Sequence, residues 1–160
     1  MDRGQYFFAE QHGKTIIKMK GNLKYTFSSG FDLFLEKLLQ KDFGDLLFDL
    51  TEAVYIDSTN LGLIAGIANK VKKQGGGKVA IVANSEIYYI LVSVGFHRVF
   101  TILGSQVQPD DLIEIPGVPQ NEKEKARMLL KAHKALMDMD DKNHSMFKDV
   151  VEMLENEVNG

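Results

Sequence analysis

The sequence predicts an α/β fold with a mixed, mostly parallel sheet, followed by a C-terminal helical hairpin. Three observations predict it. Short apolar runs alternate with helix-length amphipathic segments up to residue 103, and parallel strands need such helical crossovers. The first two runs, 6–10 and 15–21, are separated by a short His12-Gly13 turn, which favours an antiparallel hairpin. Beyond residue 119 only helical periodicity remains.

The first half of the predicted domain follows from the spacing of its apolar residues. In the second strand Ile17 and Met19 alternate with lysines, which is typical of a half-buried strand. A helix comes next, and Ser28 or Ser29 can cap its start. Its apolar positions, at the spacing of one helical face, are Phe31, Phe34, Leu35, Leu38 and Leu39. Residues 46–50 then form a short buried strand.

The second half repeats the pattern of strand and helix. A strand over 54–56 runs directly into a helix that ends at Lys72-Lys73-Gln74 and Gly75–Gly77, and the apolar residues of this helix are Leu61, Ile64, Ala65, Ala68 and Val71. A strand over 79–83 precedes a helix that Ser85 caps and Gly95 stops. The apolar residues of that helix are Ile87, Ile90, Leu91 and Val94, and a strand over 99–103 follows it.

The domain organisation is predicted as an α/β domain over 1–105, a proline-interrupted acidic connector over 106–119 and a helical extension over 120–160. One extension helix covers about 120–137, with Ala126, Leu129, Leu130, His133 and Met137 inward, and the other covers about 145–158, with Phe147, Val150, Val151, Leu154 and Val158 on one stripe. Neither helix can bury its apolar face alone. They must pack on each other, on the sheet domain or on another chain, and the sequence leaves these open.

Composition excludes several function classes. The 160 residues carry a net charge of -3 with lysines and arginines dispersed, so we expect no nucleic-acid partner. Cysteine is absent, which excludes a thiolate metal site or nucleophile. No long apolar run or signal-like start is present, so we expect a cytoplasmic protein without a membrane partner. The segment 138–149 departs from a calcium loop, and no catalytic triad is discernible. We expect neither an enzyme nor a bound metal or cofactor.

The segment with most chemical meaning is Ile56-Asp57-Ser58-Thr59-Asn60-Leu61-Gly62. Asp, Ser and Thr are favoured helix caps, so a purely structural cap is the simplest interpretation. A switch is the other interpretation. A phosphate on Ser58 would meet free backbone amides and the positive end of the helix dipole. Such a phosphate leaves the fold intact and changes the surface potential enough to weaken a docked partner.

The order of a strand, I-D-S-T-x-L-G, a helix, a GGGKVAIV strand and a short helix before GFHRVF resembles the STAS domain of bacterial anti-sigma-factor antagonists over about residues 5–103. The resemblance implies the STAS fold and phosphorylation of Ser58, with Thr59 as a secondary candidate, by a kinase that doubles as an anti-sigma factor. It also implies that a PP2C-type phosphatase restores binding, which releases a sigma factor for stress-response transcription. The helical tail resembles a proteobacterial branch whose antagonist works with a response regulator carrying a phosphatase domain.

The predicted partner-binding residues are Lys24, Tyr25, Asp57, Ser58, Thr59, Asn60, Leu61 and Gly62, with a neighbouring loop at 84–86. Two positions depart from the family pattern. Asn60 stands where many members have Gly, and Asn also tolerates left-handed backbone angles. Lys24 stands where the family often has an Asp that engages the kinase, so Lys24 either changes that encounter or pairs with phosphoserine. The alternative function is a scaffolding STAS module that is not reversibly phosphorylated.

Overall fold

A single mixed sheet, flanked by helices, organises the chain in the computed structural model, which describes residues 3–41, 43–75, 77–104 and 109–160. Residues 106–108 of the predicted connector and the middle glycine of Gly75–Gly77 lie outside this description. The strands are β1 (Gln5–Gln11), β2 (Lys14–Leu23), β3 (Asp45–Leu50), β4 (Ala53–Ile56), β5 (Val79–Ala83), β6 (Thr101–Leu103) and β7 (Ile113–Glu114). The helices are α1 (Ser29–Leu38), α2 (Ser58–Lys73), α3 (Ser85–Ser93), α4 (Glu122–Met139) and α5 (Asp141–Asn159), with 3-10 turns η1 (Tyr25–Phe27) and η2 (Phe96–Arg98).

The sheet is mixed and mostly parallel, as predicted. Its order is β6-β5-β3-β2-β1-β7, and β4 pairs with the far end of β2. The pairs formed by β2 with β3, β3 with β5, β5 with β6 and β2 with β4 are all parallel. The predicted hairpin of β1 and β2 is antiparallel. Its turn residues His12 and Gly13 have φ of 51° and 75°, the left-handed backbone that a two-residue hairpin turn requires.

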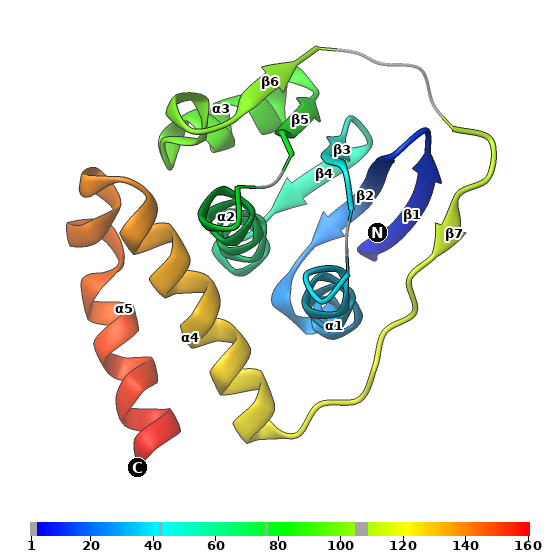
Figure 1. The fold of residues 1–160 in the computed structure, drawn as a ribbon. Helices are drawn as coiled ribbons and strands as arrows, with labels where there is room; N and C mark the ends of the chain where they lie inside the picture. The colour runs from blue at the N-terminus through cyan, green and yellow to red at the C-terminus, as the bar shows by residue number, and fades with distance from the viewer. Residues whose placement is uncertain (1–2, 42, 76, 105–108) are drawn as a thin grey trace.

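The helices of the sheet domain cover one face of the sheet, and Figure 1 shows α1 and α2 side by side between the strands and α4. The main core lies between these layers, where Phe31 of α1 stacks on Tyr6 and meets Phe48 edge-on. Alternate strand residues point the other way because side chains alternate across a strand. There Ile16, Leu47 and Val82 form a second, smaller cluster. The five predicted apolar positions of α2 are all buried.

The predicted caps of α1 and α3 are wrong in detail. Ser28 is the N-cap of α1, but its side chain makes no capping bond and shares its hydroxyl proton between the carbonyl of Lys24 and the side-chain oxygen of Asn60, each 3.1 Å away. Ser29 donates to the carbonyl of Val118. Asn84, rather than Ser85, caps α3 by accepting from the amide of Ile87. Tertiary partners therefore outcompete the local capping role of these serines.

Two elements differ from the predicted strands near the connector. The strand predicted over 99–103 begins only at Thr101, because the preceding residues Phe96–Arg98 form the 3-10 turn η2. The predicted connector contains the short strand β7, which pairs antiparallel with β1 at the sheet edge. The chain then presses against α1, since a Cβ on Gly30 would lie 1.9 Å from the carbonyl oxygen of Pro116.

The C-terminal helices form the predicted hairpin, in which α4 and α5 run side by side in opposite directions (Figure 1). Besides packing on α5, α4 packs along α2 of the sheet domain. Because α4 serves two neighbours, its buried residues differ from the predicted inward set: Leu129, Leu130 and Met137 are half-buried, and the buried residues are Ala126, Met128, Ala132, His133 and Leu136.

The second helix of the hairpin is longer than predicted. It begins at Asp141 rather than Ser145, and only Asp140 separates it from α4. Val150 is 36% exposed and not inward as predicted. The boundary at residue 105 stays a prediction, and side chains from α4 and α5 join the main core: Met128, Ala132, Leu136 and Phe147. Within the described ranges no helix is long and apolar enough to cross a membrane.

Asn84→Ala tests the corrected cap of α3. The Asn84 side chain caps α3 and also donates to the carbonyls of Thr51 and Ala53, at 3.1 and 3.0 Å. Its loss removes a cap and leaves carbonyls without their donor, so we expect a loss of about 1–3 kcal/mol in the free energy of unfolding by urea. Ser85→Ala is the control and should change stability by less than about 0.5 kcal/mol. The reverse ranking would restore Ser85 as the cap.

Candidate functional site

Asp57 forms the cap at the start of α2, directly after β4. Its Oδ1 accepts from the backbone amide and from the side-chain Nδ2 of Asn60, both at 2.9 Å. Its Oδ2 accepts from the backbone amide of Tyr25 at 2.6 Å. Because β2 and β4 are parallel, the chain that leaves each of them emerges at the same edge of the sheet. Asp57 therefore joins the 24–27 segment to the start of α2.

Asn60 is a buried hydrogen-bond junction beneath this cap. Its side-chain oxygen accepts from the hydroxyl of Tyr6 at 2.6 Å and from Ser28 Oγ at 3.1 Å. Burial raises the pKa of Tyr6, so the phenol stays protonated and donates. Among the described residues other than glycine, only His12 has positive φ. Asn60 therefore does not use the left-handed backbone that asparagine tolerates: it is helical, and its side-chain amide forms the hydrogen bonds at this position.

The two candidate phosphoacceptors differ in exposure. Thr59 is 2% exposed, whereas Ser58 is half-buried. A hydroxyl must reach solvent to meet a kinase, so the arrangement supports Ser58 over Thr59.

Ser58 Oγ lies 2.8 Å from Nε2 of His133, a residue of α4 that is 6% exposed. The other ring nitrogen, Nδ1, lies 2.6 Å from the carbonyl oxygen of Leu129. A carbonyl can only accept, so Nδ1 carries a proton. In the neutral imidazole Nε2 is then the acceptor, and the hydroxyl of Ser58 donates to it.

A serine hydroxyl on an imidazole is also the arrangement that activates nucleophiles in hydrolases. In this chain the main-chain carbonyl of Leu129 takes the place at Nδ1 that a carboxylate has in those enzymes. The imidazole sits on α4, which itself packs along α2. The hydrogen bond between Ser58 and His133 therefore links α2 to α4, with Nε2 accepting the proton of the serine hydroxyl. We call this hydrogen bond the clasp.

The structure brings some of the predicted partner-binding residues to the surface and buries others. Lys24 and Tyr25 are exposed, Tyr25 to 41%, and Asp57 and Ser58 are half-buried. Within the described part of the chain, the ammonium group of Lys24 forms no ion pair. The residues that the structure buries are Thr59, Asn60, Leu61 and Gly62.

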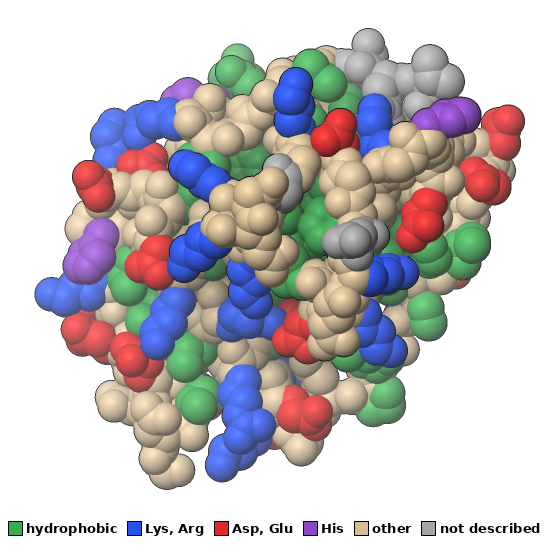
Figure 2. Space-filling model, viewed as in Figure 1, with side chains coloured by type: hydrophobic (Ala, Val, Ile, Leu, Met, Phe, Trp, Pro, Cys, Tyr) green, Lys and Arg blue, Asp and Glu red, His purple; other side chains and the backbone are tan. Residues whose placement is uncertain are grey.

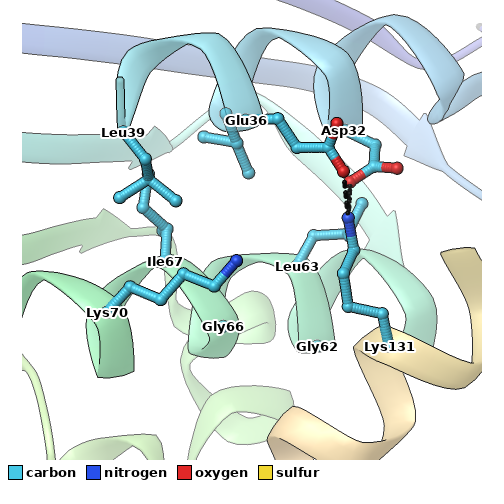
Figure 3. Close-up of a pocket in the computed structure, with 10 residues that line it drawn as sticks. Asp32, Glu36, Leu39, Gly62, Leu63, Gly66, Ile67, Lys70 and Lys131 are labelled. Atoms are coloured by element: carbon cyan, nitrogen blue, oxygen red, sulfur yellow. Dashed lines mark hydrogen bonds and ion pairs between the residues drawn. The ribbon is translucent and has the colours of Figure 1, made fainter. Parts of the chain in front are cut away.

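Sequence reasoning missed how α4 reaches the site. Lys131 of α4 extends across α2 and forms ion pairs with Asp32 and Glu36 of α1, as Figure 3 shows. Burial raises the pKa of Asp32 despite this neighbouring ammonium group. Hydrogen bonds to the two carboxylates outweigh the burial of Lys131 and raise its pKa. Seventy-five positions separate Ser58 from His133, so no local pattern could reveal their contact.

The face of the molecule in Figure 2, onto which the carboxyl ends of α1 and α2 open, carries both acidic and basic side chains. Exposed apolar side chains lie on β4 and α3 instead, with Val54 60%, Tyr55 45% and Tyr89 76% exposed. Exposed aromatic residues are typical of protein interfaces. Over the described ranges, no group of three or more His, Asp or Glu side chains is arranged to hold a metal.

Comparisons with known proteins agree with this fold. A sequence model of the STAS domain family matches residues 6–108. A solved anti-sigma factor antagonist from Mycobacterium paratuberculosis has a similar fold, with a TM-score of 0.58 and 14% identity over 64% of this chain and 87% of that one. The NMR structure of the protein TM1081 gives 0.53 and 21% identity over 60% and 78%. A comparison with curated proteins found no match.

Asn60→Ala tests the buried junction. The substitution leaves the hydroxyls of Tyr6 and Ser28 without their shared acceptor, so the free energy of unfolding should fall by about 2–4 kcal/mol. Asn69→Ala, on the half-buried later part of α2, is the matched control and should cost less than about 0.5 kcal/mol. Urea unfolding followed by circular dichroism measures both. Equal effects would contradict the role of Asn60.

Proposed function

The chain belongs to the STAS domain family, and we propose that it is an anti-sigma factor antagonist switched by phosphorylation of Ser58. In this proposal the unphosphorylated chain binds an anti-sigma factor, and that binding releases a sigma factor for transcription. The observation that carries the proposal is the position of Ser58, which is half-buried in the first turn of α2, beside buried Thr59. The fold of the mycobacterial antagonist supports it.

The switch is a phosphoryl transfer from ATP held by the partner, an anti-sigma factor that is also a serine kinase. Ser58 Oγ attacks the γ-phosphorus, the new Oγ–P bond forms, and the bond from that phosphorus to the β,γ-bridging oxygen breaks. ADP leaves, and the hydroxyl proton passes to a base of the kinase. The product carries about -1.5 to -2 charges at the helix start, where the dipole and backbone amides favour an anion.

The added charge acts on the partner because it changes the surface that the partner contacts. The phosphate stands beside the carboxylate of Asp57, and the exposed neighbours Lys24 and Tyr25 frame it. A partner surface that is complementary to the neutral serine then meets a concentrated negative charge. A PP2C-type phosphatase removes the phosphate and restores binding. In the proteobacterial branch that the helical tail resembles, this phosphatase is a domain of a response regulator.

Substitutions at Ser58 test the switch in binding. We expect Ser58→Asp to bind the anti-sigma kinase about tenfold or more weakly than wild type, because it places a like charge in the interface. Ser58→Ala should bind at least as tightly as wild type, because it adds no charge and removes the hydrogen bond from Ser58 to His133, and it should accept no phosphate. Ser145→Asp, which adds the same charge on exposed α5, is the control. Surface plasmon resonance with the kinase recovered on immobilised Ser58→Ala measures all four. Equal binding by Ser58→Asp and Ser145→Asp would count against the switch.

Peptide-resolved mass spectrometry on protein from its native cells, in growth and in stress, tests the modification itself. We expect phosphate in the 56–62 segment, on Ser58, in an amount that changes with condition. Absence of phosphate from this segment in every condition would favour the scaffolding alternative, and a large native assembly would support that alternative directly.

A further inference from the structure

The backbones of α4 and α2 touch at the candidate site. A Cβ placed on Gly62 would lie 2.0 Å from the carbonyl oxygen of Ala132, a distance that no side chain tolerates. One turn later, a Cβ on Gly66 would lie 3.6 Å from the Cβ of Ala135, an ordinary contact. Only glycine at residue 62 allows α4 this approach, so the docking of α4 depends on a residue of the predicted phosphoacceptor segment.

The clasp between Ser58 and His133 lies one helical turn from that contact. His133 is buried, and its Nδ1 is committed to the carbonyl of Leu129, so its Nε2 depends on the hydroxyl proton of Ser58. A buried nitrogen without that donor destabilises the docked state. The docked position of α4 thus depends on a proton that phosphorylation removes.

Further polar contacts hold the hairpin on both sides of the clasp. Figure 3 shows Lys131 reaching from α4 to Asp32 and Glu36 on α1. At the other end, Asp140 accepts from Arg98 at 2.6 Å, and buried Asn143 donates to the carbonyl of Val94 at 2.9 Å. The hairpin is therefore a docked element with defined contacts to α1, α2 and the end of α3.

We propose that the C-terminal hairpin is an intramolecular lid on the phosphoacceptor, and that its docking and a phosphate on Ser58 exclude each other. The inference rests on the proposed function, because it assigns the regulation of the same serine. In the docked state Ser58 Oγ faces His133 and the backbone of α4 covers Gly62. A kinase that surrounds the hydroxyl must displace α4, and phosphoserine, once formed, places a bulky phosphate group where the hydroxyl now meets the buried Nε2.

The exclusion works in both directions because coupling between two equilibria is reciprocal. Whatever undocks the hairpin makes Ser58 a better kinase substrate, and phosphorylation keeps the hairpin undocked. A partner that contacts Gly62 competes with α4 as well, since the backbone of Ala132 covers this glycine in the docked state. The docked hairpin therefore opposes phosphorylation of Ser58 within the same chain.

Two glycine substitutions test the lid without touching the serine. In the full chain, Gly62→Ala pushes α4 away, and amide hydrogen exchange within Glu122–Met139 should become about tenfold faster or more. Gly66→Ala makes the same change in the same helix and should leave that exchange unchanged. Unaltered exchange in β3 of both variants reports an intact core. Equal protection of α4 in the two variants would overturn the lid.

Phosphoserine incorporated at position 58 during translation tests the exclusion directly, and remains available if Gly62→Ala does not fold. We expect α4 and α5 to exchange about tenfold faster or more than in a chain with phosphoserine at position 145. Unchanged or slower exchange would show that His133 accommodates the phosphate, and would overturn the exclusion.

The two proposals fail separately. Native protein that never carries phosphate on Ser58 removes the proposed function, but leaves the exchange result of the glycine pair and of incorporated phosphoserine standing. Native phosphorylation of Ser58 together with undisturbed protection of α4 retains the switch and removes the lid.

Discussion

The carboxylate of Asp57 holds the start of α2 to the chain that leaves β2, and the geometry of the candidate site depends on it. Both of its oxygens accept from N–H groups, one from Tyr25 and the other from Asn60. A helix start leaves backbone amides unsatisfied, and this cap satisfies one of them while fixing the direction in which the helix leaves the sheet. Ser58, the next residue, is held at the protein surface as a result.

Asn60 connects the cap at Asp57 to the core by hydrogen bonds. Its amide joins the cap to Tyr6 on β1 and to Ser28 at the start of α1, in a region closed to solvent. Buried polar networks of this kind are stiff when every member is satisfied and costly when one is lost. The site therefore sits on a rigid base formed by two strands and two helices. A change at Ser58 consequently has little effect on the structure of the core beneath it. A change at Ser58 acts mainly on the element that packs over this surface.

In the docked state the hairpin is what covers that surface. Its approach depends on a close backbone contact at Gly62 and on a hydrogen bond from Ser58, and both lie within one turn of α2. Apolar burial of Met128, Ala132 and Leu136 stabilises the docked hairpin further. A single hydroxyl can control a docked element of this size because folded and undocked states differ by a small balance of large terms.

The sequence by itself determined the elements whose signals are local: the alternation that makes β2 half-buried, the helical spacing of α2, the His12-Gly13 turn and the serine-bearing helix start. It also determined that the tail forms two amphipathic helices. Tertiary structure decided what those signals leave open. Ser28 bonds to the carbonyl of Lys24 and the side chain of Asn60, and Ser29 bonds to the distant carbonyl of Val118, so neither side chain caps α1. Asn60 is a helical junction because its partners come from β1 and the start of α1. Two-residue β7 exists only because β1 offers an edge. The meeting of Ser58 with His133 joins residues 75 positions apart, and such a contact is set by how helices pack, which periodicity along a chain does not encode.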